Sequence, residues 1–372
     1  METLKLPFYA RAAFIFVAAY AFIYALYIGQ NIIVPIIYAT IIAITLNPFV
    51  NFLVRKNFSK VSAIIMAVVL VFVITAGLIY VVSNQVSIFA ETYPQFQAKL
   101  KTTNTQLTNW VAQNFHIKIE SINAWIKESQ DTALKEAGLM AGRTLLSLTS
   151  AFVVLLLLPV YLFMILYYKT LLLEFTRQLF KNRDHVTVME VLFGTKVIIQ
   201  SYLGGLLIEA AIIATLNSAG LLILGIDYAV ILGVTGALLN VIPYIGGVIA
   251  IALPMIIAFV TKDSISYPLL VLGIYLLIQF TDNHLIIPRI VASKVKINAL
   301  VSVIAVLIGG SLWGVAGMFL SIPLTAIIKV VFDHIEIMKP WGFLLGNIVP
   351  SATKLSFIKP KKKPQLEVIK GD

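Results

Sequence analysis

The chain has 372 residues, of which 60% are hydrophobic and 12% are charged, and its formal net charge is +11. Soluble domains have roughly 45–50% apolar and about 25% charged residues, so this composition excludes an ordinary water-soluble protein and indicates a membrane protein. We interpret the excess Lys and Arg residues as part of cytoplasmic loops beside anionic lipid rather than as a nucleic-acid-binding surface. The sequence contains no cysteine, which excludes disulfides and a cysteine-ligated metal site.

The first segment, residues 1–88, contains three apolar runs, and a spanning helix needs about 20 apolar residues. The runs cover residues 7–28, 32–54 and 61–88. The first run resembles a signal peptide, but no small-residue cleavage site follows it and further spans come at once. We therefore interpret it as a permanent span.

The second segment, residues 89–143, is polar, with Lys and Glu interleaved and apolar residues at helical spacing. This pattern predicts two or three amphipathic helices outside the hydrocarbon, on the extracytoplasmic side. Their apolar faces are expected to pack against the chain's own spans or a neighbouring subunit. The alternative is a ligand-binding domain, which the periodicity favours less.

The third segment, residues 144–335, is the predicted transport core. Ordinary spans are expected at 145–168, 197–224 and 267–288, with a basic link between the first two. A polar, Lys-rich tail, residues 336–372, follows and is expected to be cytoplasmic.

Two further apolar stretches in the core, 228–260 and 299–332, are 33 and 34 residues long. As single helices each would be about 50 Å long, whereas the hydrocarbon core is about 30 Å thick. The first stretch is interrupted at residues 240–247 and the second at 309–317, where Gly and Pro indicate turns. Each therefore predicts a re-entrant helical hairpin. Long helices that tilt or kink, with glycines that permit close packing, are the alternative.

Charge distribution favours the hairpins. If both long stretches crossed the membrane, the basic link at 289–296 would lie outside, against the positive-inside bias. With two hairpins, inside segments hold 21 of the 28 Lys and Arg residues. The sequence thus predicts an all-α protein of a bacterial inner membrane. It has six full spans, two hairpins that enter from opposite faces, and both termini in the cytoplasm. Opposed broken elements near the midplane are how secondary transporters build substrate sites.

Ionisable residues within spans are costly and usually functional. Glu209 lies well inside the fifth span, and Asp282 lies near Gln279 and Asn283 at the inner end of the sixth. On an α-helix the last three would share one face that could line a solute path. A structural role for Asp282, paired with Arg289 or a Lys, is the alternative, and for Glu209 the two roles are evenly balanced.

Enzyme signatures are missing from the sequence. It contains no Walker A loop, no H-E-x-x-H zinc motif and no G-x-S-x-G nucleophile elbow. His284 alone is too little for a metal site. We therefore expect no catalytic residue, no cofactor, no metal and no direct use of ATP.

Three sequence blocks, 240–247, 282–289 and 308–326, resemble the autoinducer-2 exporter family of bacterial membrane proteins. The resemblance is specific over roughly residues 195–335 and holds only in layout before that. It implies an oligomeric permease. Some relatives are associated with export of the furanone signal autoinducer-2, others with exchange of sodium or lithium for protons.

The expected partners are a small solute, a coupling proton or sodium ion, membrane lipid and further copies of the chain. Residues expected along the solute path are Asn240, Pro243, Gly246, Gly247, Gln279, Asp282, Asn283, Gly309, Gly310, Gly314 and Glu209. Residues expected to anchor the fold are Pro288, Arg289 and Pro323. A permease for a small polar organic molecule is the preferred function, because few buried carboxylates are available for ion exchange. A cation/proton antiporter is second and a membrane scaffold third.

Overall fold

The structure of the protein is a computed structural model that describes residues 7–115, 157–180, 184–241, 245–292 and 295–347. These residues form helices and short turns, apart from one isolated bridge between Ile297 and Gly346. Six of the described helices are long and apolar enough to cross a membrane, or seven if a bent pair counts as one span. The predicted class, an all-α polytopic membrane protein, is confirmed.

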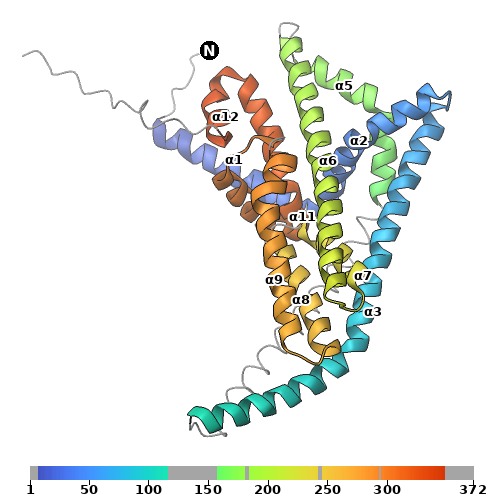
Figure 1. Cartoon of the computed structure of the whole chain (residues 1–372). Helices are drawn as coiled ribbons and strands as arrows, with labels where there is room; N and C mark the ends of the chain where they lie inside the picture. Colours follow the sequence, from blue (N-terminus) through green and yellow to red (C-terminus); the bar gives the residue numbers. More distant parts are fainter. Residues whose placement is uncertain (1–6, 116–156, 181–183, 242–244, 293–294, 348–372) are drawn as a thin grey trace, which may run out of the picture.

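Helices α1 (Phe8–Ile28), α2 (Gln30–Arg55) and α3 (Lys60–Phe115) form the N-terminal part (Figure 1). Gly29 separates α1 from α2. Helix α3 continues without interruption from the predicted third span into the predicted insertion, and Pro94 lies within it. A proline inside a helix removes one hydrogen bond and favours a kink. The remainder of the insertion, residues 116–143, lies outside the described residues.

A bent pair of helices follows. The helix Leu157–Tyr167 and α5 (Lys169–Gln178) meet at an angle of 65°. The first of them is the described part of the predicted fourth span, and residues 144–156 lie outside the description. Helix α5 is bent by 65° from the axis of the span before it and is therefore directed away from that span (Figure 1).

Before the second hairpin, the predicted transport core contains one long helix and several shorter ones. Its elements before the second hairpin are α6 (His185–Ile223), α7 (Ala229–Asn240), α8 (Ile245–Thr261), α9 (Ser266–Thr281) and the π-helical turns η2 (Asp282–Ile286) and η3 (Pro288–Ala292). Helices α7 and α8 run antiparallel, because a Cβ on Gly236 would touch Ala250 while Gly246 lies against Leu239. The hairpin predicted at 228–260 is therefore present.

The second hairpin is folded within α11 (Ala299–His334). A straight helix of 36 residues would be about 54 Å long. Yet the backbone N–H of Asn298, just before α11, donates to the carbonyl of Leu345 at 3.1 Å. Leu345 ends the short helix α12 (Lys339–Leu345), which follows the 3-10 turn η4 (Glu336–Met338). Because these short elements cannot reach back so far, α11 must reverse direction.

The reversal occurs at Trp313 (φ −134°) and Gly314 (φ 60°, ψ −141°), which are the non-helical residues inside α11. A positive φ of this kind suits glycine. The predicted tip glycines Gly309 and Gly310 lie before the turn. Gly309 instead permits the two limbs to cross, since a Cβ there would overlap the carbonyl of Gly317.

Different elements lie at the two ends of the molecule. The α2–α3 turn, α5 and α12 lie at one end, and the α8–α9 turn lies at the other (Figure 1). Helix α6 runs from the first end to the second, the α7–α8 hairpin starts from the second, and the α11 hairpin starts from the first. The two hairpins thus enter the bundle from opposite ends, as the sequence predicts.

Candidate functional site

A cavity of about 580 Å³ lies in the transport core. Helix α6, the turn end of the α7–α8 hairpin, the α9–η2 junction and both limbs of α11 enclose it. Most of its wall is aliphatic. The polar side chains that line it are Tyr202, Glu209, Asn240, Gln279, Asn283 and Ser302. A mainly apolar pocket with a few convergent polar groups is the usual form of a small-molecule site.

Helix α6 contributes Tyr202 and Glu209, which are 6% and 7% exposed. They are seven residues apart, close to two full helical turns, so both project from the same face. Gly205, between them, lets the helix approach η3, because a Cβ there would come within 2.8 Å of the Ile290 carbonyl. This close packing holds the face with Glu209 toward the cavity.

Asp282 is the most completely buried acidic residue of the described chain, with no exposed surface. Its Oδ2 accepts a hydrogen bond from Nδ2 of Asn240 at 3.0 Å, while its Oδ1 has no hydrogen-bond partner among the described residues. The bond joins the start of η2 to the last residue of α7. It therefore ties the tip of the first hairpin to the end of α9.

The α-helix gives way to a π-helical turn at Asp282, which lies between the cavity residues Gln279 and Asn283. A single face was predicted for Gln279, Asp282 and Asn283 on regular α-helical spacing. Gln279 and Asn283 do line the cavity, whereas Asp282 does not line it and accepts a hydrogen bond from the wall residue Asn240. A π-helical turn widens the spacing of side chains, and such turns are frequent at functional sites.

The two predicted tip glycines of the first hairpin differ in their surroundings. A Cβ on Gly246 would overlap the backbone carbonyl of Leu239, so only glycine permits this approach of α8 to α7. A Cβ on Gly247 would lie 3.6 Å from Gln279 Oε1 and 3.7 Å from Asn240 Oδ1, in ordinary contact. The two amide oxygens therefore converge beside Gly247 on the cavity wall.

Other predicted site residues lie away from this wall. Gly309, Gly310 and Gly314 belong to the crossing and turn of the α11 hairpin. Pro323 is buried in the second limb, and Pro288 and Arg289 begin η3. Pro243 falls outside the described residues. No group of three His, Cys, Asp or Glu that could hold a metal occurs in the part of the chain that the structure describes.

Sequence reasoning missed Tyr202 and Ser302 as cavity residues. The signal for Tyr202 was its spacing of seven from Glu209, which places two polar groups on one face of an otherwise apolar helix. Ser302 carried no such signal. It reaches the cavity because the α11 hairpin places its first limb on the wall opposite residues of α6 and α8 that are far from it in the sequence.

The chain is similar in sequence to known proteins. The model for AI-2E family transporters matches residues 14–337. The chain is 27% identical to the AI-2 transport protein TqsA of Escherichia coli K12 over 307 residues, which cover 82% of this chain and 87% of TqsA. It is 26% identical to YhhT of the same organism over 320 residues, covering 86% and 89% of the two chains. It is 32% identical to YrrI of Bacillus subtilis 168 over 133 residues, which cover 36% of this chain and 37% of YrrI.

Proposed function

This chain belongs to the AI-2E family of transporters, and from that premise we propose that it is a permease that moves a small polar organic solute through the cavity between its two hairpins. The proposed transport uses no ATP hydrolysis. The solute either follows its own gradient or is coupled to an ion gradient.

One observation carries the proposal: three neutral amide side chains converge on one apolar cavity. Asn240 is the last residue of α7, and Gln279 and Asn283 lie at the α9–η2 junction. All three line the same cavity. Amides donate and accept hydrogen bonds without a net charge. Such a lining suits an uncharged solute with several hydroxyl or carbonyl groups, and a volume of about 580 Å³ accommodates a molecule of that class.

The proposed substrate class is a hydroxylated solute similar to autoinducer-2, and the proposed direction is export. The relative TqsA is named as an AI-2 transport protein and aligns over 82% of this chain. The family match over residues 14–337 includes every residue that lines the cavity. The polar lining is compatible with a small oxygen-rich molecule of this kind.

For topology we propose a bacterial inner membrane, with the α5 and α12 end in the cytoplasm and residues 89–143 outside. The supporting observation is charge. Arg55, Lys56 and Lys60 occupy the turn between α2 and α3 at the α5 end, and positive residues favour the cytoplasmic side. Helix α1 contains no buried residue, and we propose that lipid and a further copy of the chain cover it in a homo-oligomer.

A cation/proton antiporter is the second candidate, because the core contains two buried carboxylates, Glu209 and Asp282. Glu209 lines the cavity, and Asp282 is close enough to interact with it electrostatically. Two carboxylates that repel each other in an apolar setting can exchange a proton for a metal ion. The neutral amides outnumber the single carboxylate on the cavity wall, which favours the permease.

Flux into proteoliposomes tests the proposal. Purified protein is reconstituted, and uptake of labelled autoinducer-2 is measured with no gradient, with a proton gradient and with a sodium gradient. Gln279→Leu removes one cavity amide and is expected to reduce organic-solute flux at least tenfold. Thr281→Val is the matched control on the same helix, because Thr281 does not line the cavity and its hydroxyl donates within the helix, to the Leu277 carbonyl. Cation flux without organic-solute flux would replace the permease by the antiporter.

A further inference from the structure

A second cavity, of about 310 Å³, lies at the α5 end of the molecule, away from the proposed solute path. It is bounded by α2, the helix Leu157–Tyr167, α5 and α6. Its walls are mainly apolar, with Leu166, Leu173 and Phe193 among them. A hollow of about 230 Å³ adjoins it and shares Asn47 and Lys196 with it.

Positive side chains surround this groove. Lys169 and Lys196 line the larger hollow, and Arg55 and Lys196 line the smaller one. Nζ of Lys169 donates to Oδ1 of Asn47 at 2.9 Å, which holds the ammonium at the mouth of the apolar part. Burial, then repulsion from Lys196 and Lys60, lowers the pKa of Lys169. These cations therefore repel one another, and a bound anion would stabilise them.

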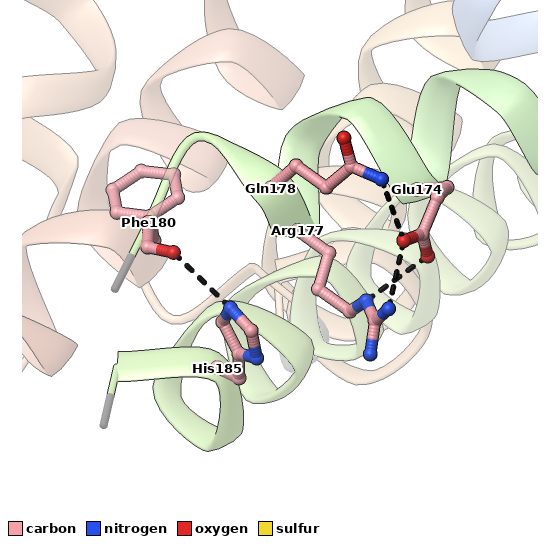
Figure 2. A network of polar contacts seen from close by, with 5 residues as sticks. All are labelled: Glu174, Arg177, Gln178, Phe180 and His185. Carbon is pink, nitrogen blue, oxygen red and sulfur yellow. Dashed lines mark hydrogen bonds and ion pairs between the residues drawn. The ribbon is translucent and has the colours of Figure 1, made fainter. Parts of the chain in front are cut away.

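No acidic residue lines either hollow in the described part of the chain. Glu174 on α5 is engaged elsewhere: it accepts two hydrogen bonds from Arg177, at 2.7 and 3.0 Å, and one from Gln178 at 2.9 Å (Figure 2). These contacts lower the pKa of Glu174, with the hydrogen bond from Arg177 as the largest cause, and keep it charged. Figure 2 also shows His185 at the start of α6 against the Phe180 carbonyl, at 3.1 Å.

The positions of the cations match a membrane surface. Arg55 ends α2 and Lys60 begins α3, Lys169 follows the bend at Tyr168, and Lys196 immediately precedes the predicted fifth span. An apolar groove that opens among cations at this depth has the two parts that a phospholipid requires, a place for an acyl chain and a place for a phosphate. Basic pockets between spans on the cytoplasmic side are typical of anionic headgroup recognition.

We propose that this groove is a binding site for one anionic phospholipid. The phosphate group lies among Lys169, Lys196 and Arg55, and part of one acyl chain lies along the apolar wall formed by α2, α5 and α6. A free anion would use the cations but leave the apolar wall unfilled, and a zwitterionic lipid would bring its own cation to a cluster that already repels itself. The site is separate from the proposed solute cavity and does not depend on what that cavity transports.

The test measures lipid binding to the full chain. Protein purified in a neutral detergent is titrated with phosphatidylglycerol, with phosphatidylcholine and with inorganic phosphate, and bound lipid is counted by native mass spectrometry. We expect saturable binding of one phosphatidylglycerol in preference to phosphatidylcholine. One Lys beside an anionic surface contributes about fivefold in affinity, so Lys169→Gln combined with Lys196→Gln is expected to weaken binding about thirtyfold.

Two variants keep the test decisive. Arg177→Gln removes a cation from the same end of the molecule but outside the groove, where it bonds to Glu174, and its lipid affinity should be unchanged. Lys169→Arg keeps the charge and should retain binding, which assigns the loss in the double variant to the removed charge. Equal binding of phosphatidylcholine, displacement of the lipid by inorganic phosphate alone, or equal losses in Arg177→Gln and the double variant would each overturn the proposal.

Discussion

Gly246 and Gly247 are neighbouring residues in the first turn of α8, and the structure predicts that alanine has opposite consequences at the two positions. At Gly246 the new Cβ would overlap the carbonyl carbon and oxygen of Leu239 and lie 3.0 Å from Cα of Asn240. All of these are backbone atoms, so α7 and α8 must move apart. At Gly247 the nearest atoms are side-chain oxygens at 3.6 and 3.7 Å, and nothing has to move.

The magnitude follows from this difference. Extra volume in a packed core costs about 1–3 kcal/mol, and Gly246→Ala belongs at the upper end because no flexible side chain can yield. The gain from replacing glycine by alanine in a helix, up to about 1 kcal/mol, applies to both variants and cancels in their difference. Gly246→Ala should therefore be less stable than Gly247→Ala by about 2–3 kcal/mol.

Two assays compare the variants. Thermal unfolding in detergent is monitored by size-exclusion chromatography, and solute flux is measured at matched protein density. Moving α7 also displaces Asn240, whose Nδ2 donates to Asp282 at 3.0 Å, so Gly246→Ala should lose flux as well as stability. Equal unfolding midpoints for the two variants would show that α8 does not approach α7 as described and would refute the reasoning.

Three further predictions concern Asp282, the topology and the second hairpin. Asp282→Asn should keep the fold and most organic-solute flux, since its amide oxygen can still accept from Asn240. Asp282→Ala removes the acceptor of the half-buried Asn240 amide and leaves a fully buried position underfilled, and it should cost about 1–3 kcal/mol in unfolding free energy. Complete loss of a pH-dependent cation flux in the Asn variant would instead support the antiporter. In this cysteine-free chain, an impermeant thiol reagent should label Ser264→Cys in intact cells and Asn347→Cys only after permeabilisation, and the reverse pattern would invert the proposed topology. Gly309→Ala should destabilise the protein by about 1–3 kcal/mol, because its Cβ would meet the backbone of the opposite limb; unchanged thermal stability would contradict the crossing.

Composition and apolar run length by themselves determined that this protein is a helical membrane protein. Both properties are obtained by counting apolar residues along the chain. A run of about 20 apolar residues can form a helix buried in lipid, whatever the tertiary packing. The hairpins were also predictable, because two stretches exceeded the thickness of the hydrocarbon and the basic link after Pro288 belonged on the inner side. The order of the elements and their opposed entry into the bundle agree with that prediction.

Only the tertiary structure decided where the second hairpin turns. The stretch from Gly309 to Gly317 contains four glycines, and any of them tolerates an unusual backbone. Packing of the two limbs selected Gly314 for the positive φ and used Gly309 and Gly317 for close approach. The sequence does not distinguish these roles, since each depends on the atoms of the opposite limb.

The candidate site shows the same division. Glu209, Gln279 and Asn283 could be singled out because polar groups in apolar spans are costly, and that cost is a property of the residue and its run. That Asp282 is fully buried against Asn240 depends on a partner 42 residues away in the chain. That Tyr202 and Ser302 reach the same cavity depends on α6 and α11 lying side by side. Long-range packing set these contacts, and no local pattern specifies them.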